Sequence, residues 1–131
     1  MKPYFLNVDL EITTATKLEA VITEMGRHVI VLHSGLAAAR KKHLLVLESS
    51  RQHAGPDSAI HALCSVIEAL SRAARRMLDG ARKEFDIGYE LRACERFSRF
   101  RLRPDTLERI VRLGATLAVT YYRGESDDGN K

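Results

Sequence analysis

The sequence predicts an α+β domain in which helices cover one face of a six-stranded, mixed or antiparallel sheet. Several segments alternate apolar and polar residues, which is typical of strands with one face in water. Other segments repeat apolar residues at spacings of three and four, as amphipathic helices do. The two kinds of segment alternate and give three successive strand–helix–strand units. Two overlapping ferredoxin-like βαββαβ units can be drawn through this order, over residues 4–91 and 43–122.

The first half of the chain is expected to contain three strands and one helix. Residues 4–12 alternate between apolar and polar side chains, which predicts a strand with Asn7, Asp9 and Glu11 in water. A short amphipathic helix should follow and end at Gly26. Strands are predicted at residues 27–33 and 43–49, and a loop with a basic tip, residues 36–42, connects them.

The second half is expected to contain two helices and three strands. The longest helix should begin at Asp57 or Ser58, continue to residue 78 and stop at Gly80. Strands are predicted at residues 85–91 and 94–102, joined as a hairpin through residues 92 and 93. A helix that begins at Pro104 and stops at Gly114 should lead into a final strand over residues 117–121.

Length and composition indicate one domain. A chain of 131 residues with 45% hydrophobic and 29% charged residues can bury one core. We expect the domain to span residues 1–123 and the polar tail, residues 124–131, to be disordered. No apolar run approaches the roughly 18 residues that cross a membrane, and the N-terminus lacks a signal-peptide pattern. The protein is therefore expected in the cytoplasm and away from membranes.

The net charge of +4 does not by itself indicate nucleic-acid binding, because acidic and basic residues are mixed along the whole chain. Two basic spots are present, at residues 40–42 and at Arg72, Arg75 and Arg76 on the long helix. Either spot could contact an acidic protein or a phosphate backbone. A solvated helix or loop surface is the alternative interpretation.

The polar face of the predicted sheet is the most informative charged surface. The charged side chains expected on it are Asp9, Glu11, Asp86, Glu90, Arg99 and Arg101. If the fourth and fifth strands pair as a hairpin, opposite charges become cross-strand neighbours that contribute about 0.2–1 kcal/mol each. We interpret this face as a solvated ladder, with a recognition surface or a set of catalytic carboxylates as alternatives. Asp9 and Glu11 could do acid–base work, but the sequence shows no burial that would raise their pKa values.

RNA binding through a sheet requires aromatic rings that stack on bases, flanked by basic residues. Phe97 lies beside Arg99 and Arg101, and Phe5 flanks Asn7. One or two rings are fewer than the usual RNA-binding pattern contains. RNA binding is therefore an alternative and not the first expectation.

Known catalytic and cofactor motifs are absent from the sequence. The five histidines form no HxH or HExxH, and the two cysteines form no CxxC. GxGxxG, GxxxxGK and GxSxG are also missing. We expect no cofactor and no metal site, and we expect Cys64 and Cys94 to be free, buried thiols.

The C-terminal part of the chain carries a regular series of core and turn residues. They are Phe100, Leu102, Pro104, Leu107, Ile110, Leu113, Gly114, Leu117, Val119 and Tyr121. With residues 85–90 and the opening strand, this series resembles the bacterial family called domain of unknown function 4279. In that family a strand, a short helix closed by Leu-Gly and a final strand ending at Tyr follow the same order. The resemblance implies a bacterial α+β protein and supplies no catalytic residues.

These observations favour a protein that is not an enzyme and that binds another protein or a second copy of itself. Some small α+β proteins of this kind resemble toxin-immunity proteins, which implies a binding role by analogy. An RNA-binding module that uses the basic spots is the first alternative. An enzyme with an unrecognised carboxylate or histidine site is the second.

Overall fold

The computed structural model describes residues 4–37, 42–91 and 99–123. The strands in this part of the chain are β1 (Tyr4–Thr14), β2 (Val29–Leu36), β3 (His43–Ser49), β4 (Arg82–Leu91) and β5 (Thr116–Arg123). The helices are α1 (Glu19–Met25), α2 (Pro56–Glu68), α3 (Arg72–Leu78) and α4 (Pro104–Leu113), with a short 3-10 turn, η1 (Gly26–His28), before β2. The predicted α+β class is confirmed.

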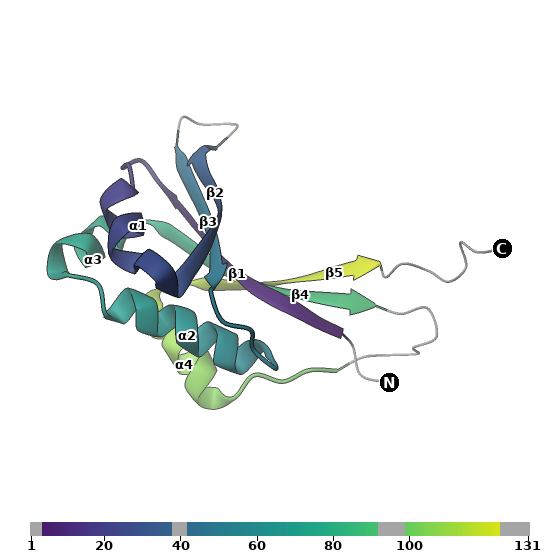
Figure 1. Cartoon of the computed structure of the whole chain (residues 1–131). Helices are drawn as coiled ribbons and strands as arrows, with labels where there is room; N and C mark the ends of the chain where they lie inside the picture. The colour runs from purple at the N-terminus through teal and green to yellow at the C-terminus, as the bar shows by residue number, and fades with distance from the viewer. Residues whose placement is uncertain (1–3, 38–41, 92–98, 124–131) are drawn as a thin grey trace.

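The strands form one mixed sheet in the order β2-β3-β1-β4-β5 (Figure 1). The central strand β1 is antiparallel to β3 and β4, and β2 is antiparallel to β3. Only β4 and β5 are parallel within the described sheet. A parallel pair needs a crossover connection, and α4 lies in the connection between them.

Alternate residues of the three inner strands form the core under the helices. The buried side chains of these strands are Val8, Leu10, Ile12, Leu45, Leu47, Phe85, Ile87 and Tyr89. Helix α2 contacts β1 and β3, and α4 contacts α2 and β5 (Figure 1). Complete burial of a side chain such as Phe85 or Leu10 contributes about 1.5–3 kcal/mol. The opposite face of the sheet carries the alternate, partly exposed residues.

The predicted long helix is wrong, because the chain forms two helices, α2 and α3, where one was expected. Ser71 interrupts the helix and caps α3, since its hydroxyl accepts a hydrogen bond from the backbone N–H of Ala74 (3.1 Å). The carboxylate of Glu24 on α1 accepts hydrogen bonds from the Ser71 backbone N–H (2.8 Å) and hydroxyl (2.7 Å). These hydrogen bonds satisfy the backbone N–H groups of Ser71 and Ala74, which in a continuous helix would donate to backbone carbonyl groups instead.

The predicted sixth strand, residues 94–102, is not found among the described residues. Residues 99–103 have no regular secondary structure, and residues 92–98 lie outside the described part of the chain. The expected hairpin with β4 is wrong, because β1 and β5 occupy the two edges of β4. Arg99 and Arg101 are therefore not cross-strand partners of Asp86 and Glu90.

Two ends of predicted elements also differ. A register shift between Phe5 and Asn7 turns Phe5 toward the core, where its ring contacts Tyr89 edge-on at 6.0 Å between ring centroids. Phe5 is therefore not available on the polar face, and Leu6 is exposed. Strand β2 begins and ends later than predicted, because residues 26–28 form the 3-10 turn.

The C-terminal helix and strand agree with the sequence. Pro104 occupies the first turn of α4, and Gly114 ends the helix with φ of 74°, in the left-handed region that favours glycine. No helix in the described ranges is long and apolar enough to cross a membrane.

Candidate functional site: the acidic face of the sheet

Carboxylates gather on the sheet face opposite the helices, across three neighbouring strands. They belong to Asp9 and Glu11 of β1, Glu48 of β3, and Glu84, Asp86 and Glu90 of β4. We call this set the acidic face. Alternation along each strand sets the direction of these side chains, because the residues between them are the buried core residues.

Strand register brings like charges directly opposite one another. Asp9 of β1 pairs with Glu48 on one side and with Asp86 on the other. Glu11 pairs with Glu84. Like charges at opposed positions destabilise a sheet, so the arrangement costs folding free energy.

The pKa values of two carboxyl groups respond to this crowding. Burial, and then repulsion from Glu48, Asp86 and Glu11, raises the pKa of Asp9 from 3.8 to about 6. Burial, with repulsion from Asp86 and Glu84, also raises the pKa of Glu11, although Arg82 acts in the opposite direction. A carboxyl group with a pKa near 6 can bind or release a proton close to neutral pH.

Asn7 is the main polar neighbour of this crowded centre. Its side-chain Nδ2 donates hydrogen bonds to Asp9 Oδ1 and to Glu48 Oε2, both at 3.0 Å. Gly88 of β4 leaves room for this side chain, since a Cβ at Gly88 would lie 2.9 Å from Asn7 Oδ1. One amide therefore bridges two carboxylates that would otherwise only repel each other.

Hydroxyl groups of β5 support the other side of the face. Thr116 Oγ1 donates to Glu84 Oε2 (2.8 Å), and Thr120 Oγ1 donates to Asp86 Oδ1 (2.7 Å). Among the described residues, no cationic side chain lies within 4.0 Å of the carboxylates of Asp9, Glu11, Glu48, Glu84 or Asp86. Neutral donors thus satisfy several of these carboxylates in part, and Arg82 acts on Glu11 only from beyond ion-pair distance within the described chain.

Apolar side chains border the acidic face. Ile30 of β2 lies opposite Glu48, and Val46 of β3 lies opposite Glu11. On the other side, the ring of Tyr122 approaches Gly88. A partner on this surface would meet negative charge in the middle and hydrocarbon at both sides.

The structure brings together four of the charged residues predicted for this surface: Asp9, Glu11, Asp86 and Glu90. Arg99 and Arg101 instead lie, exposed, in the segment that leads into α4. Phe97 and Cys94 lie outside the described residues. The expected pairs of Asp86 and Glu90 with Arg99 and Arg101 do not form, because the two arginines lie outside the sheet. The charges that oppose one another on β1, β3 and β4 are alike in sign.

Sequence reasoning missed two members of the acidic face, Glu48 and Glu84. Glu84 has the same parity as Asp86, so extending the alternation by one step would have found it. Glu48 follows the apolar run of residues 44–47, and only the pairing of β3 with β1 shows which way it points.

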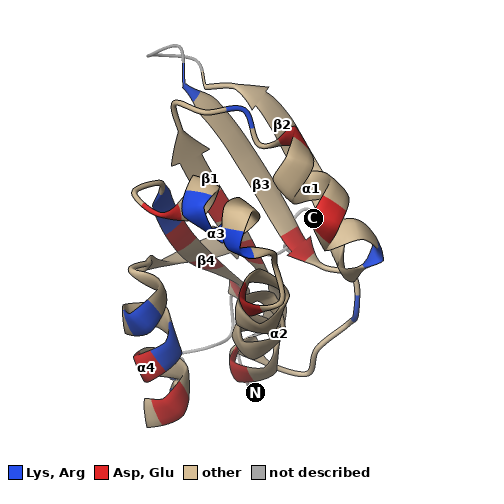
Figure 2. Cartoon of the chain, turned by 90° about the vertical axis from the view of Figure 1, so that its left-hand side faces the viewer, with Lys and Arg blue, Asp and Glu red and all other residues tan. Residues whose placement is uncertain are grey.

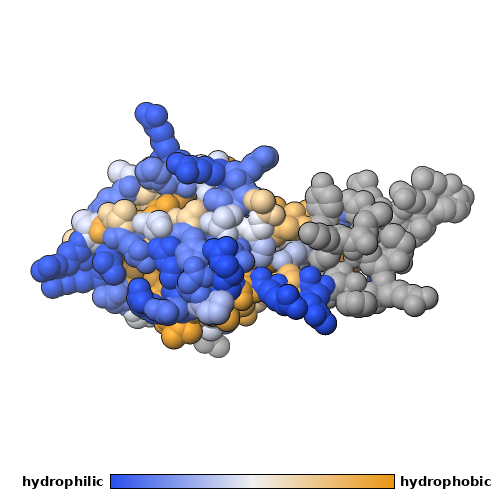
Figure 3. Space-filling view, turned by 90° about the horizontal axis from the view of Figure 1, so that it is seen from below, coloured by the Kyte–Doolittle hydropathy of each residue, from blue (hydrophilic) through white to orange (hydrophobic). Residues whose placement is uncertain are grey.

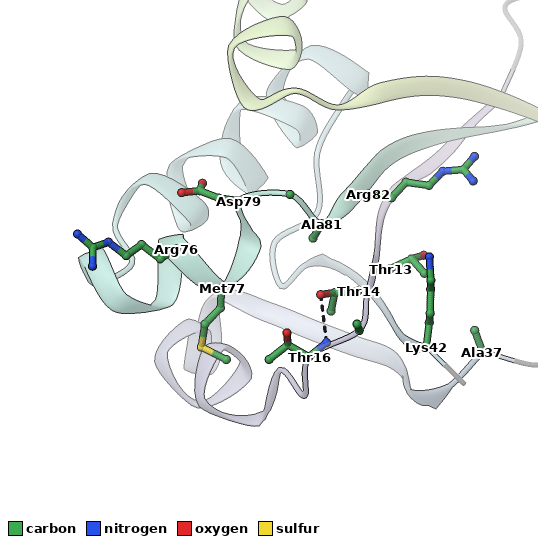
Figure 4. Close-up of a pocket in the computed structure, with 12 residues that line it drawn as sticks. Thr13, Thr14, Thr16, Ala37, Lys42, Arg76, Met77, Asp79, Ala81 and Arg82 are labelled. Carbon is green, nitrogen blue, oxygen red and sulfur yellow. Dashed lines mark hydrogen bonds between the residues drawn. The ribbon is translucent and has the colours of Figure 1, made fainter. Parts of the chain in front are cut away.

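The basic residues Arg72, Arg75 and Arg76 lie exposed on α3, which packs on α1 in the helix layer (Figure 2). Arg76 also lines a hollow of about 810 Å³ between residues 13–16 and the end of α3. Its guanidinium and that of Arg82 point away from each other (Figure 4), so they do not converge on one anion.

His53 and Cys64 have structural surroundings. His53 joins the loop before α2, with Nε2 2.9 Å from Ser49 Oγ and Nδ1 3.1 Å from Ser58 Oγ. Cys64 is buried as predicted, and burial raises the pKa of its thiol to about 11. Within residues 4–37, 42–91 and 99–123, no three His, Cys, Asp or Glu side chains are placed to hold a metal ion.

A catalytic role for the carboxylates finds little geometric support. The hollow nearest to them, about 620 Å³, is lined by Asn7 and Glu48 but not by Asp9, the group whose pKa is raised to about 6. A general acid or base needs a site where substrate can reach its proton. The acidic face is better suited to contact than to catalysis.

No family model matches the chain, and no curated protein or solved structure is similar to it.

Proposed function

We propose that this protein is a non-enzymatic binding module whose acidic face binds a basic segment of a protein partner. The observation that carries the proposal is the register of β1 with β3 and β4, which sets carboxylates against carboxylates. Departures from the rules of stable folding concentrate at functional sites. A partner that supplies lysine or arginine side chains would relieve this repulsion on binding, so the energy stored in the free protein would favour the complex.

The apolar borders support a protein partner. Exposed Ile30 and Tyr122 lie on either side of the carboxylates and offer surface that a protein can bury. Nucleic acid is disfavoured on this face, because its phosphates would meet negative charge. RNA binding through Arg72, Arg75 and Arg76 is the competing outcome of the experiment below.

The specific form of this proposal is an immunity-like role in the bacterial cytoplasm, in which the acidic face covers a basic surface of a toxin. We propose in addition that the chain is related to the family called domain of unknown function 4279. It is supported by the order of α4, its stop at Gly114 and the final strand β5. The relationship adds no functional residue.

We also propose that residues 4–91 form a ferredoxin-like unit in which α3 is an insertion, and that α4 and β5 extend this unit. The element order β1-α1-β2-β3-α2-β4, with α3 as an addition, supports this description. The strand order β2-β3-β1-β4, with every neighbouring pair antiparallel, also supports it.

The binding proposal is tested by titrating the isotopically labelled protein with a decalysine peptide and following the backbone amide signals by NMR. We expect shifts centred on β1, β3 and β4 that weaken as salt is added, since the attraction is electrostatic. Shifts confined to the helices, or none at low salt, would show that the acidic face does not bind basic segments. A decauridine RNA is the parallel probe, and shifts centred on α3 with RNA alone would favour the competing function.

A further inference from the structure

Strand β2 forms an edge of the described sheet and carries neither of two common protections of such edges, a charged residue or a proline. Within the described chain it pairs only with β3. Its sequence, VIVLHSGL, contains no Asp, Glu, Lys, Arg or Pro. Ile30, Val31, Leu32 and Leu36 are 46%, 39%, 48% and 65% exposed. Natural proteins commonly protect edge strands with charged residues or proline, because the unpaired backbone groups otherwise pair with another strand.

The register of β2 with β3 shows which way its side chains point. Val31 lies opposite Leu47 and Ser34 lies opposite Leu45, and both leucines are buried under the helices. Val29 and Leu36 share this helix side by alternation, whereas Ile30, His33 and Gly35 lie on the open side. A register shift leaves Leu32 as an additional residue between the two halves of the strand.

The order of helix-side and open-side residues along β2 is the same when it is followed from either end of the strand. Two antiparallel copies of β2 can therefore pair with matching faces. When two copies pair antiparallel about a two-fold axis between Leu32 and His33, Val29 meets Leu36 and Val31 meets Ser34, all on the helix side. Ile30 then meets Gly35 on the open side. Each of these residues thus meets a residue of the same face, as a continuous sheet requires.

Electrostatic repulsion does not oppose this pairing. In the paired arrangement, the nearest carboxylates of the two acidic faces are those of Glu48 on the two β3 strands, which are separated by three strand spacings, or about 14 Å at about 4.8 Å each. This separation exceeds the Debye length of about 8 Å at physiological ionic strength. The acidic faces of two copies would therefore lie on the same side of the sheet without strong mutual repulsion.

We propose that β2 pairs antiparallel with β2 of a second copy of this chain and forms a two-fold symmetric dimer with one continuous sheet. The self-complementary face pattern and the uncharged edge select a second copy over a charged partner. This contact does not involve the carboxylates and leaves both acidic faces open, although it shares Ile30 of β2 with the apolar border of the acidic face.

The experiment measures the mass of the full chain by sedimentation velocity over a range of concentrations. We expect the wild type to shift from monomer to dimer, and Leu32→Lys and Leu32→Glu each to weaken dimerisation by roughly tenfold or more. An equimolar mixture of the two variants should restore the dimer, because opposite charges then meet near the two-fold axis. Val111→Lys is the matched control, since Val111 is a 76% exposed apolar residue on α4. Helix α4 packs on α2 and β5, so a charge at Val111 should leave the β2 contact intact. In the view from below, hydrophobic areas lie among hydrophilic side chains (Figure 3).

Amide hydrogen exchange of the wild type provides a second measurement that does not depend on the folding of any variant. Amides of β2 should exchange more slowly as the protein concentration rises. A wild type that stays monomeric, β2 exchange that is independent of concentration, or dimerisation lost in Val111→Lys but kept in Leu32→Lys would each overturn the proposal.

Discussion

Polar side chains have different neighbours in two regions of this protein, the contact between α2 and α4 and the acidic face of the sheet. Between α2 and α4, Arg109 donates to His61 Nδ1 (2.8 Å), and His61 Nε2 donates to Thr106 Oγ1 (3.0 Å). The Thr106 hydroxyl in turn donates to Asp57. Arg109 also pairs with Glu68 at 2.8 Å. In this helix network each donor meets an acceptor and each cation meets an anion.

The acidic face differs because its members share one sign. Asp9 lies between Glu48 and Asp86, and among the described residues the Asn7 amide is the donor that bridges Asp9 and Glu48. The helix network joins elements distant in sequence and stabilises the fold. We expect the like charges of Asp9, Glu48 and Asp86 to weaken the fold, and we interpret the difference as a division between groups that stabilise the protein and groups placed to bind a partner.

The largest expected change in stability comes from a substitution that breaks the helix network. Thr106→Val removes a fully buried hydroxyl and leaves His61 and Asp57 without their shared partner. We expect the free energy of unfolding to fall by about 1–3 kcal/mol, measured by urea denaturation. Thr120→Val is the matched change on the other side, since Thr120 donates to Asp86 at the partly exposed acidic face. An equal or larger loss for Thr120→Val would contradict the comparison.

The next largest expected effect is a gain in the free energy of unfolding. Asp9→Asn removes one of three neighbouring charges and keeps an oxygen that accepts from Asn7, so we expect a gain of about 0.5–1 kcal/mol at neutral pH. The pKa of Asp9 is about 6 in the folded protein, against an ordinary value of 3.8. The folded protein therefore retains the proton longer, and stability falls as pH rises through this window.

The gain from Asp9→Asn should therefore be complete above about pH 6 and should disappear below about pH 4. Urea denaturation at several pH values measures it. A gain of the same size in acid and at neutral pH would show that charge repulsion is not its cause.

The smallest expected effect concerns an exposed ion pair, and it tests whether such a pair contributes as much to the free energy of unfolding as the helix network does. Arg112 and Glu108 form an exposed i,i+4 pair at 2.6 Å, with side chains that are both 68% exposed. Arg112→Ala should lower the free energy of unfolding by only about 0.3–0.5 kcal/mol. Thermal unfolding measures the change, and a loss as large as that of Thr106→Val would remove the distinction between buried and exposed networks.

The sequence predicts the helix side of the sheet well, because burial controls it. Alternation along Val8, Leu10 and Ile12 identifies core positions whichever strands lie beside them. The end of α4 at Gly114 is also local, since the backbone conformation there favours glycine.

The composition of the acidic face could not be predicted, because it depends on strand pairing between distant residues. Asp9 and Asp86 are both visible as polar positions, but only the register shows that they oppose each other. The break between α2 and α3 has the same origin. Glu24, 47 residues before Ser71 in the chain, supplies the carboxylate that stabilises it.

The central claim is that the acidic face sacrifices stability for binding, and one variant tests both parts. Asp9→Asn with Asp86→Asn is compared with Glu19→Gln plus Glu108→Gln, which removes the same charge from exposed helix positions. For each protein, the free energy of unfolding is measured by urea denaturation and the affinity for decalysine by calorimetry. We predict that the first variant becomes more stable while its affinity falls by roughly tenfold. The control should keep its affinity and should lose about 0.3–0.5 kcal/mol of stability, because Glu108→Gln removes the exposed pair with Arg112. A first variant that binds decalysine as tightly as the control, or that loses stability, would contradict the account.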